Sequence, residues 1–89
     1  MKHATDKALE LLEDLLERVR ARDGLKEKSG GVFYRKSRAF LHFHEDPTGL
    51  YADLRVTGEF ERYPVNTDSE RAALLAEIDR ACKREDAAP

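Results

Sequence analysis

The chain has 89 residues, of which 40% are hydrophobic and 38% are charged, and its formal net charge is −2. A chain of this length buries only about 60–65% of its unfolded surface, so its apolar residues suffice for one core. We therefore expect a single domain over residues 1–89 with frayed ends at 1–4 and 85–89. No room remains for the deep cavity of a complex enzyme.

Three features predict a cytoplasmic protein that does not enter a membrane. The longest fully apolar run is Ala72 to Ala76, which is far too short for a spanning helix. The N-terminal residues lack the apolar core of a signal peptide. Cys82 is the only cysteine, so no internal disulfide can form, as is usual in a reducing compartment.

Residues 5–23 predict an amphipathic helix. At about 100° per residue its apolar side chains share one face, namely Ala8, Leu9, Leu11, Leu12, Leu15, Leu16 and Val19. Thr5 or Asp6 can cap the start of the helix. Gly24 suits the left-handed residue that follows a helix end.

Residues 25–31, LKEKSGG, predict a flexible connector. Four segments with strand composition follow it, at 32–36, 38–44, 50–56 and 59–65. DPTG at 46–49 and TG at 57–58 predict hairpin turns, since Pro presets φ and Gly accepts positive φ. Pro64 cannot donate a ladder hydrogen bond, so the last of these strands is expected at an edge.

A second helix is predicted from Thr67 to about Lys83, because Thr67 and Glu70 have the spacing of a capping box. Short connections make successive strands pair antiparallel. Each helix has one apolar face, and both need the same face of a sheet. The expected fold is an α+β two-layer sandwich, with an N-terminal helix, an antiparallel meander of three or four strands and a C-terminal helix.

The stretch FLHFHEDP at 40–47 contains the residues best suited to a site. His42 and His44 lie on one face of their strand, and Leu41 and Phe43 lie on the other. If the apolar residues of 50–56 also face the helices, the numbers of two directly paired residues must add up to an odd value, as for residue 42 paired with 51 or 53. A three-residue Pro-Thr-Gly loop would instead give even sums and bring the histidines to the apolar face. We favour the odd register, reached through a four-residue loop or a bulge.

In the odd register the sheet has an outer face that no helix covers. This face is predicted to form an interface with a second copy or another protein, through Phe40, His42, His44, Tyr51 and Tyr63. His42, His44 and Asp53 also have ligand types that zinc or iron accepts, and they are the candidates for a weak divalent-metal site. Asp46 is expected to accept hydrogen bonds from its own turn.

A basic segment, residues 18–38, has a local charge of about +6. It offers a patch for an anion or nucleic acid, formed by Arg18, Arg20, Arg22, Lys26, Lys28, Arg35, Lys36 and Arg38. Phe33 and Tyr34 could stack on unpaired bases. The acidic remainder of the chain opposes nucleic-acid binding, which therefore stays the alternative.

Nothing in the sequence predicts catalysis or a bound cofactor. Cys82 shares the apolar face of the second helix and is expected to act as a small hydrophobic residue. No histidine nearby in sequence is placed to activate Ser29, Ser37 or Ser69, and Gly30-Gly31 is too short for a phosphate loop. The sequence thus favours a small non-enzymatic binding domain that acts as a homodimer or with an unidentified protein.

Overall fold

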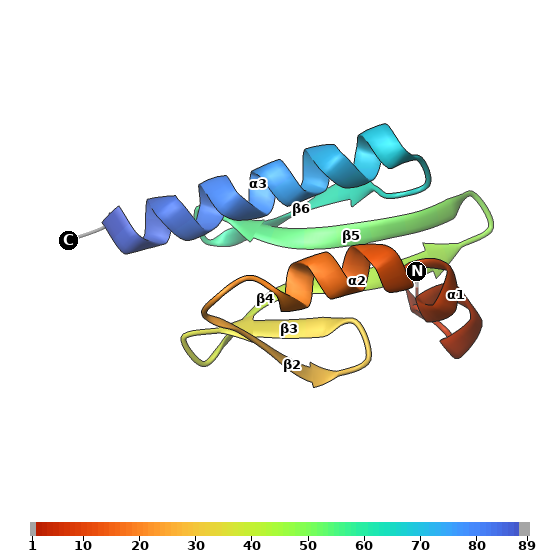
Figure 1. Cartoon of the computed structure of the whole chain (residues 1–89), viewed down its shortest axis with the longest axis horizontal. Helices are drawn as coiled ribbons and strands as arrows, with labels where there is room; N and C mark the ends of the chain where they lie inside the picture. Colours follow the sequence, from red (N-terminus) through yellow and green to blue (C-terminus); the bar gives the residue numbers. More distant parts are fainter. Residues whose placement is uncertain (1, 88–89) are drawn as a thin grey trace.

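A computed structural model describes residues 2–87 and the side chains of residues 4–84. The protein has two layers, with the helices packed on one face of a single sheet (Figure 1). This confirms the α+β order expected from the sequence. The elements are β1 (Lys2–His3), α1 (Asp6–Leu11), α2 (Glu13–Arg20), β2 (Leu25–Ser29), β3 (Val32–Arg35), β4 (Arg38–Asp46), β5 (Gly49–Val56), β6 (Glu59–Pro64) and α3 (Asp68–Ala87).

The sheet is an antiparallel meander in the order β2-β3-β4-β5-β6. The prediction that β6 lies at an edge is confirmed. β1 pairs with β4 through Lys2↔Glu45 and His3↔His44, beyond the point where β3 stops pairing. No helix in the described part of the chain is both long and apolar enough to cross a membrane.

The expectation of a flexible connector at 25–31 is wrong for residues 25–29, which form β2, the outer strand of a hairpin with β3. At the two ends that were expected to fray, residues 2–3 form β1 and residues 85–87 continue α3. Residues 1, 88 and 89 lie outside the described residues.

The expected N-terminal helix consists of two segments that meet at Leu12. The backbone of Leu12 has φ −97° and ψ 3°, and its N–H donates to the carbonyls of Ala8 and Leu9 in a tightened last turn. The break changes the direction of the chain, so Leu12 is buried while Leu11 is 62% exposed. The prediction that Leu11 belongs to the apolar face is therefore wrong. Thr5 caps α1, because its hydroxyl accepts a hydrogen bond from the Ala8 N–H at 3.3 Å.

The capping box at the start of α3 is confirmed. The Glu70 N–H donates to Thr67 Oγ1 at 3.1 Å, and the Thr67 N–H donates to Glu70 Oε1 at 3.1 Å. Glu70 Oε1 also accepts from the Asn66 N–H at 2.8 Å. These bonds satisfy backbone donors that a helix start leaves without partners.

The β4–β5 hairpin has the odd register that burial of one apolar face requires. His42 pairs with Asp53 and His44 pairs with Tyr51. Asp46 pairs with Gly49, so the loop contains only Pro47 and Thr48, and the expected four-residue loop or bulge is wrong. A two-residue loop gives the odd sum without any bulge in this hairpin.

The core lies between the sheet and the helices. It contains Leu12, Leu15, Leu16 and Val19, the strand residues Phe33, Phe40, Leu41, Phe43, Ala52 and Leu54, and Val65, Leu74, Leu75, Ile78 and Ala81. Cys82 is half-buried against this core, as expected of a small hydrophobic residue.

Two of the expected interface residues lie elsewhere. Phe40 is 1% exposed and belongs to the core. A β-bulge explains this, because Phe33 pairs with Leu41 while Tyr34 pairs with Ala39, which leaves Phe40 as the extra residue. Tyr63 pairs with Ala52 and packs against the core, so it lies on the helix-covered side. Neither residue belongs to the outer face.

Candidate functional site

The face of the sheet opposite the helices is called here the open face. Strand alternation from the core residues places Lys26, Val32, Tyr34, His42, His44, Tyr51, Asp53, Arg55, Phe60 and Arg62 on it. The Lys28 ammonium lies over the Tyr34 ring on the same face, and alternation along β4 adds Asp46. The open face therefore combines aromatic rings, two imidazoles and the four cations Lys26, Lys28, Arg55 and Arg62 with the carboxylates of Asp46 and Asp53.

His42, His44 and Asp53 form a cluster at the centre of the open face. His42 Nδ1 lies 2.6 Å from His44 Nε2, and His44 Nε2 lies 3.1 Å from Asp53 Oδ2. One ligand atom from each of the three residues lies within 4.8 Å of the other two. The structure thus brings together all three residues that the sequence offered as metal ligands.

This cluster is polar but largely shielded from solvent. His44 is 9% exposed and Asp53 is 8% exposed, although no helix covers this face. Arg62 on β6 donates to both oxygens of Asp53, from Nε at 2.8 Å and from Nη2 at 3.0 Å. This bidentate guanidinium holds the pKa of the Asp53 carboxyl below its usual range, despite the opposing effect of burial.

Phe60 and Arg62 belong to the site but were not identified from the sequence. The rings of Phe60 and His42 meet edge to face with centroids 4.8 Å apart. The Arg55 guanidinium lies over the Phe60 ring, 4.5 Å from its centroid. The register supplies the missing signal, because it pairs Asp53 with Arg62 and Arg55 with Phe60.

Asp46 has the local role that the sequence predicts. Its Oδ1 accepts hydrogen bonds from the Thr48 N–H at 2.8 Å and from the Thr48 hydroxyl at 2.5 Å. These hydrogen bonds lower the pKa of the Asp46 carboxyl. Thr48 Oγ1 also lies 2.7 Å from the Tyr51 hydroxyl, so the turn orients Tyr51 at the end of the open face.

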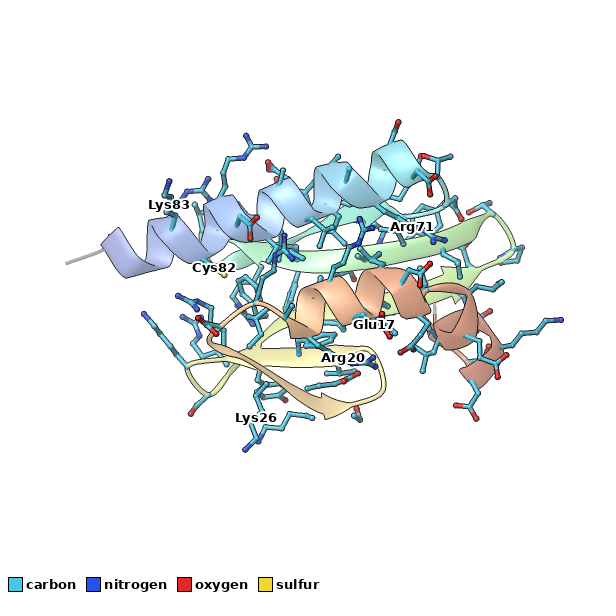
Figure 2. The ribbon with its side chains drawn as sticks, in the orientation of Figure 1. Glu17, Arg20, Lys26, Arg71, Cys82 and Lys83 are labelled. Atoms are coloured by element: carbon cyan, nitrogen blue, oxygen red, sulfur yellow. The ribbon has the colours of Figure 1, made fainter. Side chains whose placement is uncertain are left out.

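The basic residues of 18–38 do not form one continuous patch. Arg20 forms ion pairs with Glu13 and Glu27, and Figure 2 shows it beside the β2–β3 hairpin. Arg22 pairs with Asp79 on α3. Arg35 is buried and donates to the Cys82 carbonyl. The remaining cations divide between the helix layer (Arg18), the open face (Lys26, Lys28) and the β3–β4 turn (Lys36, Arg38).

The Arg20–Glu27 pair predicts a loss of stability in acid. The hydrogen bond from Arg20 lowers the pKa of Glu27 below its ordinary value of 4.5, so the pair stabilises the fold above about pH 4.5 and this contribution is lost as the pH falls through the folded-state pKa. Urea unfolding of the wild type and of Glu27→Gln at pH 3 and pH 7 checks this. The unfolding free energy of Glu27→Gln should change less between the two pH values, by a difference of under about 1 kcal/mol. Equal slopes for the two proteins would contradict the prediction.

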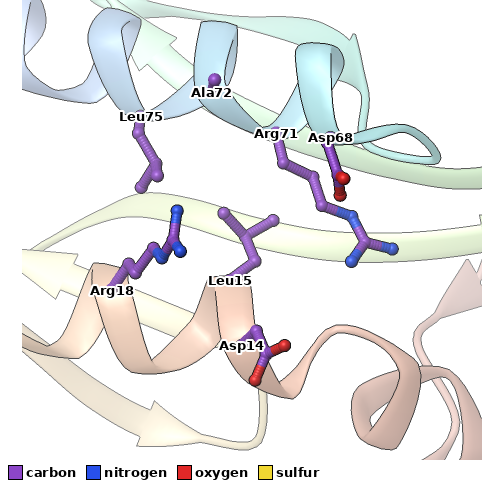
Figure 3. Close-up of a pocket in the computed structure, with 7 residues that line it drawn as sticks. All are labelled: Asp14, Leu15, Arg18, Asp68, Arg71, Ala72 and Leu75. Atoms are coloured by element: carbon purple, nitrogen blue, oxygen red, sulfur yellow. The ribbon is translucent and has the colours of Figure 1, made fainter.

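Two grooves lie outside the open face. One, of about 510 Å³, lies between α2 and α3, where Leu15 and Leu75 point toward each other and Arg18 and Arg71 lie nearby (Figure 3). Asp14 and Asp68 also line it, so its cationic and anionic groups balance. A second groove, of about 370 Å³, is lined by Arg22, Asp23, Asp79, Arg80, Cys82 and Lys83. Neither groove is lined by a residue of the histidine cluster.

No family model, curated protein or solved structure matches the chain. The fold and the site define it as a two-layer α+β domain with one uncovered sheet face. The histidine–aspartate cluster lies at the centre of that face.

Proposed function

We propose that the protein is a non-enzymatic binding domain whose open face associates with the open face of a second copy. The observation that carries this proposal is the placement of α2 and α3 on the same side of the sheet (Figure 1). Val32, Tyr34 and Tyr51 on the opposite side are only partly buried, and Phe60 is 38% exposed. Such a surface is stabilised when a partner removes it from water.

The sheet edges are poorly suited to association. β2 has the sequence LKEKS and β6 has the sequence EFERYP. Charged side chains and a proline on outer strands oppose strand addition. Face-to-face contact is thus the better-supported mode of self-association.

Charge placement also suits a second copy. The open face has Lys26 near the start of β2 and Asp46 at the β4–β5 turn, which lie at different ends of the sheet (Figure 1). In an isologous dimer whose two-fold axis lies midway between these groups, Lys26 of each copy would face Asp46 of the other. The single cysteine, which cannot form an internal disulfide, supports a cytoplasmic location for this proposed dimer.

Two variants test the dimer. Phe60 and Leu11 are the exposed large hydrophobic residues of the described side chains, and only Phe60 lies on the open face. Sedimentation equilibrium should give a dimer at micromolar concentration, Phe60→Ser should weaken it roughly tenfold or more, and Leu11→Ser should leave it unchanged. A wild-type protein that stays monomeric, or equal effects of the two variants, would refute the proposal.

The same protein should be assayed for nucleic-acid binding, because the open face also has a stacked cation–aromatic pair. The Lys28 ammonium lies 5.5 Å from the centroid of the Tyr34 ring, an arrangement that can accept a stacked base. If the monomer binds single-stranded RNA at about 50 mM salt and Tyr34→Ala abolishes this binding, nucleic-acid recognition replaces the dimer proposal.

A further inference from the structure

We propose that His42, His44 and Asp53 bind one divalent transition-metal cation per chain, with zinc as the probe. All three ligands come from the same chain. The inference is therefore independent of the proposed self-association and survives its failure.

The ligand atoms converge from two adjacent strands at the middle of the sheet. His42 pairs directly with Asp53, and His44 lies two residues further along β4 on the same face. The distances are 2.6 Å from His42 Nδ1 to His44 Nε2 and 3.1 Å from His44 Nε2 to Asp53 Oδ2, and all three ligand atoms lie within 4.8 Å of one another. Tetrahedral zinc with bonds of about 2.0–2.1 Å separates its ligands by about 3.3 Å, which falls within this range.

Hydrogen bonds among the three side chains cannot satisfy both short contacts of His44 Nε2 equally well. A neutral imidazole has one N–H, and Nε2 of His44 faces both His42 Nδ1 and Asp53 Oδ2. If Nε2 holds a hydrogen, its two neighbours must share it. If His42 Nδ1 donates instead, a lone pair of His44 faces the carboxylate. A cation at the centre is attracted by all three groups at once.

The strands that hold the cluster are packed into the core on their other face. Leu41, Phe43, Ala52 and Leu54 alternate with the ligand residues along β4 and β5, and all four are buried in the core. Ligands on packed strands stay close to their binding geometry without a large ordering cost. Two imidazoles and one carboxylate suit zinc or another first-row cation, and a fourth position remains for water or an external ligand.

A bound cation would compete with Arg62 for the carboxylate of Asp53. Its guanidinium makes two hydrogen bonds to Asp53, while its side chain is 48% exposed and can move toward solvent. A positive charge next to the carboxylate weakens the attraction for a second cation. Metal affinity should therefore depend on Arg62, although this residue is not a ligand.

Calorimetric titration of the metal-free full chain with zinc tests the site. We expect one zinc per chain in the wild type, at least tenfold weaker binding in His42→Gln, and unchanged binding in Cys82→Ser. Cobalt should give the visible absorption of a four-coordinate ion with the wild type and not with His42→Gln. Absence of binding at about 100 μM zinc, one zinc per two chains, or binding that persists in His42→Gln would overturn the proposal.

A matched pair of charge variants separates a metal site from a purely structural ion pair. Arg62→Gln should bind zinc several-fold more tightly than the wild type, because it removes the competing charge from Asp53. Lys28→Gln removes an exposed cation that contacts Tyr34 rather than Asp53, and should leave zinc affinity nearly unchanged. Weaker binding by folded Arg62→Gln, or equal changes in the two variants, would show that Asp53 does not serve as a ligand.

Discussion

Phe43→Ala is expected to cost about 3–5 kcal/mol of folding free energy, the typical range for truncating a buried phenylalanine. Phe43 is 1% exposed, lies on the middle strand β4 and belongs to the core cluster. A domain of this size has a total stability on the order of 5 kcal/mol. The variant should therefore be close to unfolded at room temperature, as judged by urea denaturation followed by circular dichroism.

The control for this variant is the same substitution on the other face of the sheet. Phe60→Ala should cost under about 1 kcal/mol in the monomer, because Phe60 is still 38% exposed. If Phe43→Ala does not fold, Phe43→Leu keeps most of the apolar volume and should unfold at a measurable, lower urea concentration. Similar costs for Phe43→Ala and Phe60→Ala would contradict the assignment of the two faces.

Gly31→Ala is expected to cost about 2 kcal/mol, through two separate causes. Gly31 has φ +73°, a conformation that an L-residue adopts only with strain. An added Cβ would also lie 2.9 Å from Leu9 Cδ2, so the leucine on α1 would have to move. Chemical denaturation of the single variant gives the total cost.

Gly30→Ala and a Leu9→Ala background separate these causes. At Gly30 the added Cβ would meet Leu9 Cδ1 at 2.8 Å, but the backbone there has no positive φ. Gly30→Ala should therefore cost less than Gly31→Ala. In a Leu9→Ala background, most of the cost of Gly30→Ala should disappear, but only part of the cost of Gly31→Ala. Equal costs at the two glycines would show that backbone strain contributes little.

The register of the central hairpin could be predicted because one physical effect dominated it. A shift by one residue would have exposed Leu41 and Phe43 and buried both histidines, and no turn preference offsets such a loss. The loop itself was predicted with the wrong length. The two-residue loop between Asp46 and Gly49 satisfies the burial pattern without a bulge, so burial decided the register and the turn followed.

The errors of prediction concern segments whose structure depends on distant contacts. β2 has the sequence LKEKS, which shows no apolar alternation because it is an outer strand with mostly exposed side chains. β1 consists of Lys2 and His3, and nothing in two residues indicates a strand. Phe40 was misplaced because a bulge changes the alternation of faces at one point, and local sequence does not mark that point.

The candidate site was predictable in part, because burial of one face fixes the register of the β4–β5 hairpin. His42, His44 and Asp53 follow from alternation once the β4–β5 register is known. Arg62 required the register of a second hairpin, β5–β6, which pairs it with Asp53. Burial of His44 and Asp53 on a face without helices could not be expected from the strand pattern, since it arises from neighbouring side chains such as Arg62.

The strand order has a consequence for how the chain folds. Every strand from β2 to β6 pairs with its neighbour in the sequence, so most of the sheet requires only short loop closures. Proteins with such local topology fold faster than those that join distant segments. The pairing of β1 with β4 is the exception, because it closes a loop that contains both N-terminal helices and two strands. The pairing of β1 with β4 is thus expected to form last, after the β4–β5 hairpin that contains the histidines.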